Sequence, residues 1–142
     1  MSGQKPFDSA RGSGGEFSTR VVQSGVRFDS STGAISVPIY QSATFSHPSL
    51  GVSTGYNYTR SGNPTRQAAE EVLADLEGGC AAFCFASGLA ALTAVFMLFK
   101  SGDRLLLGED LYGGTYRLLN SVFARFGIET SYVDTTDPAL VE

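Results

Sequence analysis

The stretch that decides the fold is Phe83-Cys84-Phe85-Ala86-Ser87-Gly88-Leu89-Ala90-Ala91. Its first four residues are apolar, which predicts a strand buried on both faces, and the apolar run from Leu89 to Phe99 predicts a buried helix. The change from strand to helix falls at Ser87-Gly88, where Ser is a favoured N-cap and Gly lets a ligand approach the backbone. A helix N-terminus has unpaired N–H groups and a positive dipole end, so this turn suits a phosphate. An ordinary strand-to-helix turn without a ligand has the same pattern.

Helices and strands alternate on both sides of this turn. Asn63-Pro64 predicts the start of a helix that Gly78-Gly79 ends. Strands are predicted over 104–107 and 128–133, and between them a helix over 116–126 with Thr115 as its N-cap. Strands separated by single helices pair in parallel, so the sequence predicts an α/β fold. Ligands of such sheets bind at the carboxyl ends of the strands, and we expect Ser87-Gly88 and the loop around Tyr112 at that edge.

The chain is predicted to have three parts. Residues 1–16 are rich in Ser and Gly and predict a flexible tail. Residues 17–61 predict an extended arm with little regular structure, which is unusual inside a compact domain and too apolar for a solvated linker. Packing of this arm on another subunit is one way to bury its apolar side chains. Residues 62–142 carry the alternating helices and strands, and we expect the arm to precede an incomplete large domain.

Composition excludes several classes of protein. The net charge is −4 with no basic block, which argues against nucleic acid as a partner. The longest apolar run is too short to cross a bilayer, and Met1 to Glu16 has no signal-peptide pattern, so we expect a soluble, cytoplasmic protein. The two cysteines, Cys80 and Cys84, and the single histidine, His47, offer no metal site; buried free thiols are the simplest interpretation of the cysteines.

The turn at Ser87 matches none of the common phosphate or nucleophile motifs. The Gly-Lys-Ser/Thr ending of a phosphate-binding P-loop is absent, and only Gly88 of a dinucleotide fingerprint is present. Phe85 and Leu89 occupy the glycine positions of a hydrolase nucleophile elbow, so Ser87 is not expected to be a hydrolase nucleophile.

A second informative stretch is Tyr56-Asn57-Tyr58-Thr59-Arg60-Ser61-Gly62-Asn63-Pro64-Thr65-Arg66. Arg60 can bind a phosphate through two parallel hydrogen bonds, and a neighbouring phenol adds a further donor. A surface arginine beside packed aromatic rings would also account for this stretch taken alone.

Several motifs in a fixed order together resemble one family from about Phe17 to the end of the chain. They are Tyr56-x-Tyr58-Thr59-Arg60-x-x-Asn63-Pro64-Thr65-Arg66, Leu73-x-x-Leu76-Glu77-Gly78-Gly79, Ala86-Ser87-Gly88-Leu89-Ala90-Ala91, Gly102-Asp103 and Leu111-Tyr112-Gly113-Gly114-Thr115-Tyr116. This series is similar to the N-terminal part of the trans-sulfuration enzymes of cysteine and methionine metabolism. These include the cystathionine lyases and synthases and use pyridoxal 5'-phosphate (PLP).

The resemblance implies a fold-type I, aspartate aminotransferase-like architecture and a set of PLP-binding residues. It implies that Ser87 and the backbone N–H groups of Gly88 and Leu89 hold the PLP phosphate. Tyr58 and Arg60 would reach the phosphate of a neighbouring subunit in a dimer of dimers. Tyr112 would stack on the pyridine ring and move protons at the leaving group. The substrate would be an amino acid containing sulfur, and elimination from cystathionine is favoured over γ-replacement by a cystathionine γ-synthase or an O-acetylhomoserine sulfhydrylase.

One departure from the family pattern matters most, and one position distinguishes members within the family. The family binds PLP on a lysine in the second half of the large domain, whereas the only lysines here are Lys5 and Lys100, and neither matches that position. We therefore expect an N-terminal fragment that is inactive alone; a non-catalytic protein that binds phosphate or pairs with a full-length subunit is the alternative. Some family members that cleave methionine carry Cys where this chain has Gly114, so methionine is expected to be the poorer substrate.

Overall fold

The computed structural model describes residues 7–8, 15–23, 28–29 and 31–141. These residues form two compact units, one ending at Cys84 and the other beginning at Phe85, and each is described separately. Most of the expected tail over 1–16 therefore lies outside the described residues. Among the described residues, no helix is long and apolar enough to cross a membrane.

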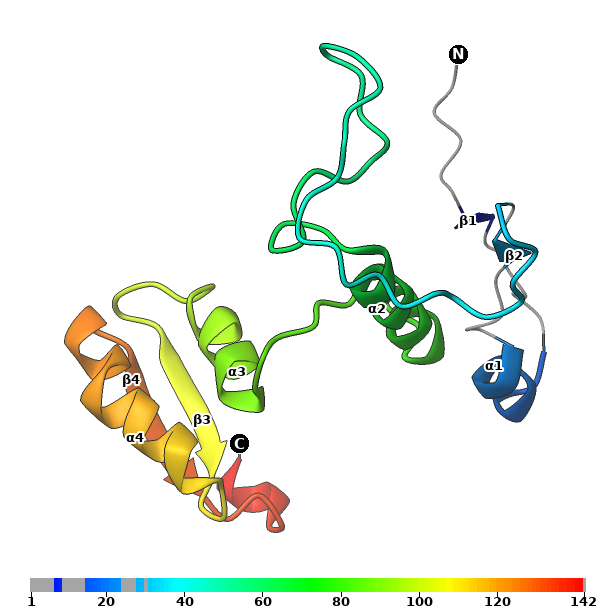
Figure 1. Ribbon diagram of the computed structural model, residues 1–142. Coiled ribbons are helices and arrows are strands. Elements are labelled where there is room, and N and C mark those ends of the chain that lie inside the picture. Colours follow the sequence, from blue (N-terminus) through cyan, green and yellow to red (C-terminus); the bar gives the residue numbers. More distant parts are fainter. Residues whose placement is uncertain (1–6, 9–14, 24–27, 30, 142) are drawn as a thin grey trace. The chain divides into compact units, whose positions relative to one another are not determined.

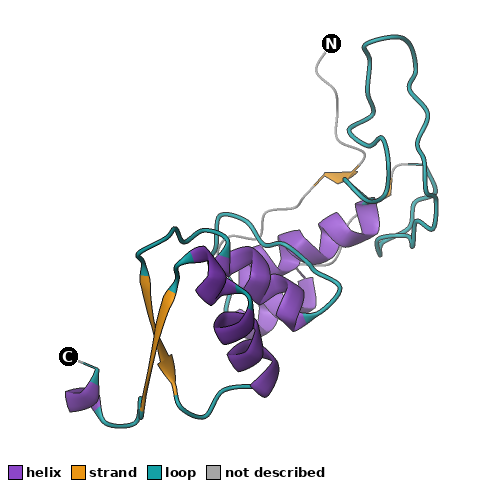
Figure 2. Cartoon of the chain, turned by 90° about the vertical axis from the view of Figure 1, so that its left-hand side faces the viewer, coloured by secondary structure: helices purple, strands orange, loops and turns teal. Residues whose placement is uncertain are grey.

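The first unit contains two helices and a long irregular segment (Figure 1). Its elements are β1 (Phe7–Asp8), α1 (Phe17–Gln23), β2 (Phe28–Asp29) and α2 (Pro64–Leu76), with β1 and β2 antiparallel. From residue 31 to the start of α2 the chain is loop, as Figure 2 shows. Its two sides are joined by hydrogen bonds from Phe45 N to Asn57 O (2.9 Å) and from Thr59 N to Ala43 O (2.8 Å). The arm thus has little regular structure over 31–63, but α1 is a helix that the sequence pattern did not predict.

Helix α2 begins where the sequence predicts it. The side chain of Asn63 accepts a hydrogen bond from Thr65 N (2.8 Å), which satisfies one of the free N–H groups of the first turn, and Pro64 takes the first helical position. Asn63 Nδ2 also donates to Tyr40 O (3.0 Å), so the cap fixes the preceding loop to the helix. Gly78 follows the helix with a φ of +66°, a left-handed conformation that favours glycine.

The second unit contains a parallel strand pair and two helices. Its elements are α3 (Gly88–Phe96), β3 (Arg104–Gly108), α4 (Gly113–Ser121), η1 (Phe123–Phe126), β4 (Glu129–Val133) and η2 (Pro138–Leu140). Strands β3 and β4 pair in parallel, with Arg104 opposite Glu129 and Gly108 opposite Val133. The predicted order of elements and the parallel pairing are confirmed for this pair.

A small hydrophobic core holds the helices against the strands. It is formed by Phe96 of α3, Leu119 of α4, Phe123 and Ile128, with the rings of Phe96 and Phe123 edge to face at 5.5 Å. Leu105 and Leu107 of β3 pack against this core, whereas Leu106 between them is exposed. Because alternate residues of a strand point to opposite faces, α3 and α4 cover the same face of β3.

The structure corrects five local predictions. The helix predicted over 89–99 ends at Phe96, and Val95, Met97 and Leu98 are exposed rather than buried. No strand forms over 80–86, because no described strand lies beside this segment to pair with it; Cys84 N donates to the Glu70 carboxylate instead (2.9 Å). Cys80 and Cys84 are exposed rather than buried. Tyr112 rather than Thr115 occupies the N-cap position of α4, and the predicted helix over 116–126 is divided between α4 and η1.

We expect Leu119→Ala to lower the free energy of unfolding by about 2–5 kcal/mol, because Leu119 has no exposed surface and the truncation leaves a cavity. Urea denaturation of the 142-residue chain measures this change. The matched control is Leu98→Ala at an exposed position, for which we expect a change within about 0.5 kcal/mol. Equal losses in the two variants would contradict the assignment of the core.

Candidate functional site

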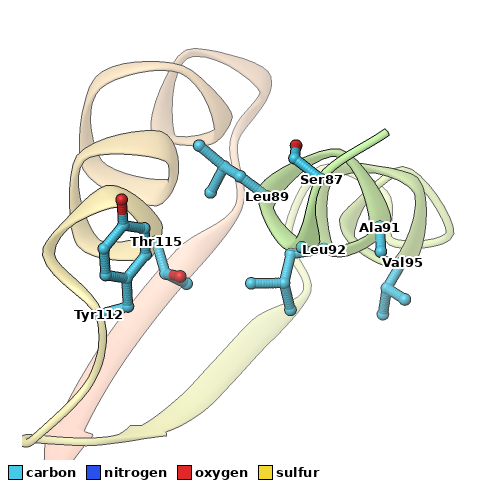
Figure 3. Close-up of a pocket in the computed structure, with 8 residues that line it drawn as sticks. Ser87, Leu89, Ala91, Leu92, Val95, Tyr112 and Thr115 are labelled. Carbon is cyan, nitrogen blue, oxygen red and sulfur yellow. The ribbon is translucent and has the colours of Figure 1, made fainter. Parts of the chain in front are cut away.

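The main pocket of the second unit lies between the N-terminal ends of α3 and α4 (Figure 3). It has a volume of about 690 Å³ and an almost entirely apolar lining. Its lining residues are Ser87, Gly88, Leu89, Ala91, Leu92, Val95, Tyr112 and Thr115. Four of the six residues predicted from the sequence, Ser87, Gly88, Leu89 and Tyr112, thus line one pocket.

The N-terminus of α3 presents two unpaired N–H groups at this pocket. Ser87 has an extended backbone, and its Oγ accepts a hydrogen bond from Ala90 N (3.1 Å), as expected for an N-cap. Within the described part of the chain, the N–H groups of Gly88 and Leu89 have no acceptor. A Cβ placed on Gly88 would meet nothing within 4 Å, so the space beside these donors is open. The turn can therefore accept an anion.

Tyr112 places an exposed aromatic ring at the same pocket. Its carbonyl accepts the first hydrogen bond of α4, from Thr115 N (2.8 Å), and this fixes its backbone at the start of the helix. The side chain remains 72% exposed. In Figure 3 the hydroxyl groups of Tyr112 and Ser87 point toward the same side of the pocket.

The position of the Tyr112 ring depends on the absence of a side chain at Gly114. A Cβ built on Gly114 would lie 2.4 Å from Tyr112 Cε1, a distance that no stable contact between carbon atoms reaches, and 3.0 Å from Cδ1, which is also tight. Gly114 is itself buried. Glycine at this position therefore lets the ring lie across the first turn of α4.

The other two predicted residues, Tyr58 and Arg60, lie together in the first unit. The guanidinium carbon of Arg60 lies 5.1 Å from the centroid of the Tyr58 ring, within the range of a cation–π contact. Both side chains are exposed, and among the described residues neither the Tyr58 hydroxyl nor the Arg60 guanidinium has a hydrogen-bond partner. They can therefore offer donors to a ligand while they support each other.

The clear pKa shifts lie outside these two groups of residues. Hydrogen bonds from the Thr32 hydroxyl and from Ser31 lower the pKa of Asp29, and those from Thr136 lower the pKa of Asp134. Each carboxylate stabilises a turn of its own loop. Among the described residues, no group of three or more His, Cys, Asp or Glu side chains could hold a metal ion.

One residue that lines the pocket, Thr115, was not predicted from the sequence as part of a site. Thr115 is buried and lines the pocket, although the pattern indicated only a helix cap. Its place one turn into α4, beside the predicted Tyr112, is a signal that could have identified it.

Comparison with known proteins identifies the family of the chain. A profile described as "Cys/Met metabolism PLP-dependent enzyme" matches residues 18–142, and the chain belongs to this family. It is 50% identical over 124 residues to the cystathionine gamma-lyase of Bacillus subtilis, covering 87% of this chain and 33% of that protein. It is also 50% identical over 119 residues to the cystathionine beta-lyase of Lactococcus lactis subsp. cremoris, covering 84% of this chain and 31% of that one.

Solved structures agree with this assignment and with the predicted fold-type I α/β class. The cystathionine gamma synthase of Xanthomonas oryzae, solved in complex with aminoacrylate and cysteine, superposes with a TM-score of 0.81 at 35% identity. That match covers 89% of this chain and 33% of the solved chain. The chain thus spans about one third of the length of its relatives.

We expect Gly114→Ala to displace the Tyr112 ring, because the new Cβ and the ring cannot occupy the same space. A chain labelled with 3-fluorotyrosine, with the Tyr112 signal assigned from Tyr112→Phe, reports the ring environment by ¹⁹F NMR. Gly113→Ala is the matched control, since a Cβ there meets nothing within 4 Å. A Tyr112 signal that moves in the control but not in Gly114→Ala would contradict this geometry.

Proposed function

We propose that this chain is the cofactor-holding N-terminal part of a PLP-dependent carbon–sulfur lyase that cleaves cystathionine by β- or γ-elimination. The single observation that carries the proposal is the pocket that brings together the N-terminus of α3 and the ring of Tyr112. Such a pocket offers an anion site and a stacking surface, which are the two features needed to hold a phosphorylated aromatic ring.

The residues at the pocket fit PLP. The free N–H groups of Gly88 and Leu89 are donors for phosphate oxygens, and the open space beside Gly88 admits the phosphate. The Ser87 hydroxyl lies at the same turn and can donate to the phosphate while its oxygen still caps Ala90 N. The apolar side chains of Leu89, Leu92 and Val95 line the remainder of the pocket.

In this proposal Tyr112 has two tasks. Its ring stacks on the cofactor, and its phenolic oxygen moves a proton at the sulfur atom that leaves or at the carbon from which it departs. When bound, PLP serves as an electron sink for removal of the α-proton of an amino acid. Gly114 contributes by leaving the first turn of α4 open to the ring.

Tyr58 and Arg60 are proposed to act on a neighbouring subunit. Both are exposed in the first unit, and the Arg60 guanidinium is held over the Tyr58 ring with its N–H groups available for a phosphate. We propose that the complete protein is a cytoplasmic homo-oligomer in which this pair binds the phosphate of the adjacent subunit's PLP. Bidentate arginine contacts are well suited to phosphate oxygens.

A second candidate function is γ-replacement, in which a thiol displaces the leaving group of an activated homoserine. It is favoured by the similarity to the cystathionine gamma synthase that was solved in complex with aminoacrylate and cysteine. The two candidates share this pocket. Elimination breaks the carbon–sulfur bond of cystathionine at the β- or γ-carbon and forms no new bond to sulfur, whereas γ-replacement forms a new carbon–sulfur bond at the γ-carbon as the activating group leaves.

The substrate test uses the complete protein with PLP. We expect cystathionine to be cleaved either to homocysteine, pyruvate and ammonia or to cysteine, 2-oxobutyrate and ammonia, and we expect methionine to react more slowly. Mass spectrometry of the products distinguishes the two eliminations. Formation of cystathionine from an O-acylated homoserine and cysteine, without cleavage of cystathionine, would instead support γ-replacement. Faster release of methanethiol from methionine would overturn the inference drawn from Gly114.

Substitution separates the proposed roles of Tyr112 and Arg60 in the complete enzyme. Tyr112→Phe keeps the ring but removes its proton, so we expect kcat to fall about 10²–10⁴-fold with PLP affinity nearly unchanged. Arg60→Ala removes a charged phosphate contact of about 1.5–3 kcal/mol, so we expect it to lower PLP affinity more than kcat. Steady-state kinetics and PLP titration of each variant give both quantities. Parent-like turnover of Tyr112→Phe would refute its role in proton transfer.

We also propose that the 142 residues alone are inactive, because their only lysines are Lys5 and Lys100. Lys100 follows the C-terminal end of α3, opposite to the Ser87 end. Borohydride reduction of the 142-residue chain with PLP, followed by peptide mapping, is expected to give no stoichiometric adduct on Lys100. Such an adduct would show that Lys100 reaches the pocket.

A further inference from the structure

Arg66 holds the backbone from which Arg60 projects. Its Nη2 donates to the carbonyl oxygen of Ser61 (3.0 Å) and its Nη1 to that of Arg60 (3.4 Å). In the described part of the chain, these two carbonyls accept from no backbone N–H. The guanidinium of Arg66, in the first turn of α2, therefore ties the turn at 60–61 to the helix.

A carboxylate on the next turn of α2 orients this guanidinium. Arg66 Nε lies 3.5 Å from Glu70 Oε1, an i,i+4 pair in which both side chains are at most about one third exposed (35% and 21%). The same oxygen accepts from Cys84 N at 2.9 Å. Glu70 thus fixes the guanidinium on one side and the backbone of the segment that leads toward Ser87 on the other.

The geometry requires an arginine rather than any cation. Three different nitrogen atoms of Arg66 contact three different acceptors, which a planar fork with separate N–H groups allows and an ammonium group on a flexible stem does not. The turn that it holds is tight: Ser61 N and Gly62 N both donate to Tyr58 O at 3.0 Å. Tyr58 and Arg60 therefore project from a turn whose backbone Arg66 holds through hydrogen bonds.

We propose that Arg66 is a positioning residue for phosphate binding: it acts through Arg60 by fixing the turn from which this side chain projects, and Glu70 keeps the Arg66 guanidinium in place. This inference rests on the proposed role of Arg60 at a PLP phosphate. Arg66 itself does not touch the ligand. Its removal therefore weakens recognition of the phosphate and leaves recognition of the pyridine ring unchanged.

The test measures ligand affinity of the complete apo-protein rather than turnover. PLP and pyridoxal, which lacks the phosphate, are titrated by absorbance and fluorescence into the parent, Arg66→Lys, Arg60→Ala and the double variant. We expect Arg66→Lys to weaken PLP binding about 3–10-fold, a coupling typical of residues in contact, with pyridoxal binding unchanged. The double variant is expected to bind PLP within about twofold of Arg60→Ala alone, because Arg66 acts through Arg60.

Arg104→Lys is the matched control. Arg104 also uses two nitrogen atoms on a carboxylate, that of Glu129, but it lies on the strand pair and lines neither the pocket nor the turn. We expect its PLP affinity to equal that of the parent. Thermal unfolding of every variant shows whether a loss of affinity only follows a loss of stability.

The outcomes separate this inference from the proposed function. Unchanged PLP affinity in Arg60→Ala would overturn the role of Arg60 and this inference with it. A loss in Arg60→Ala without one in Arg66→Lys would overturn this inference alone. Additive losses in the double variant would overturn this inference, because Arg66 would then act independently of Arg60. Equal losses for PLP and pyridoxal would also overturn it, because the effect would then be one on general stability rather than on the phosphate.

Discussion

The packing of α3 and α4 on one face of β3 is the constraint on which the site depends. Phe96 and Leu119 meet in the core with Leu105 and Leu107 beneath them, so the two helices cannot move apart without exposing apolar surface. Ser87 and Tyr112 stand at the N-termini of these helices. A small apolar core thereby places a helix N-terminus with free N–H groups and an aromatic ring at one pocket.

The local signals in the sequence predicted this arrangement where short-range chemistry decides it. Asn63-Pro64 and Ser87-Gly88 start helices because capping is a contact within a few residues, and the structure has both caps. The parallel pairing of β3 with β4 followed from one helix between two apolar runs. By contrast, 80–86 has the composition of a buried strand but forms none, because a strand exists only through hydrogen bonds to another strand, which composition cannot supply.

The difference between short-range signals and contacts in space also applies to the site. Residue type and order were enough to select Ser87, Gly88, Leu89 and Tyr112, which line one pocket. They could not show why Gly114 is a glycine, since this depends on where the Tyr112 ring lies in space. They also gave Arg66 no role, because its acceptors are backbone carbonyls that any residue at 60 and 61 would provide. Contacts of this kind become visible only when the side chains are placed.

The polar groups of the proposed site differ in what holds them. The N–H groups of Gly88 and Leu89 are fixed by the geometry of α3, so most substitutions at these positions keep the donors and change only the space around them. The donors of Arg60 sit at the end of a long, exposed side chain whose freedom opposes binding. Two contacts limit this freedom. The Tyr58 ring packs against the Arg60 guanidinium, and Arg66 donates a hydrogen bond to the backbone carbonyl of Arg60. In the proposed role, a side-chain donor that reaches another subunit needs support that a helix N-terminus already contains, and we infer that the hydrogen bonds around residues 56–70 supply this support.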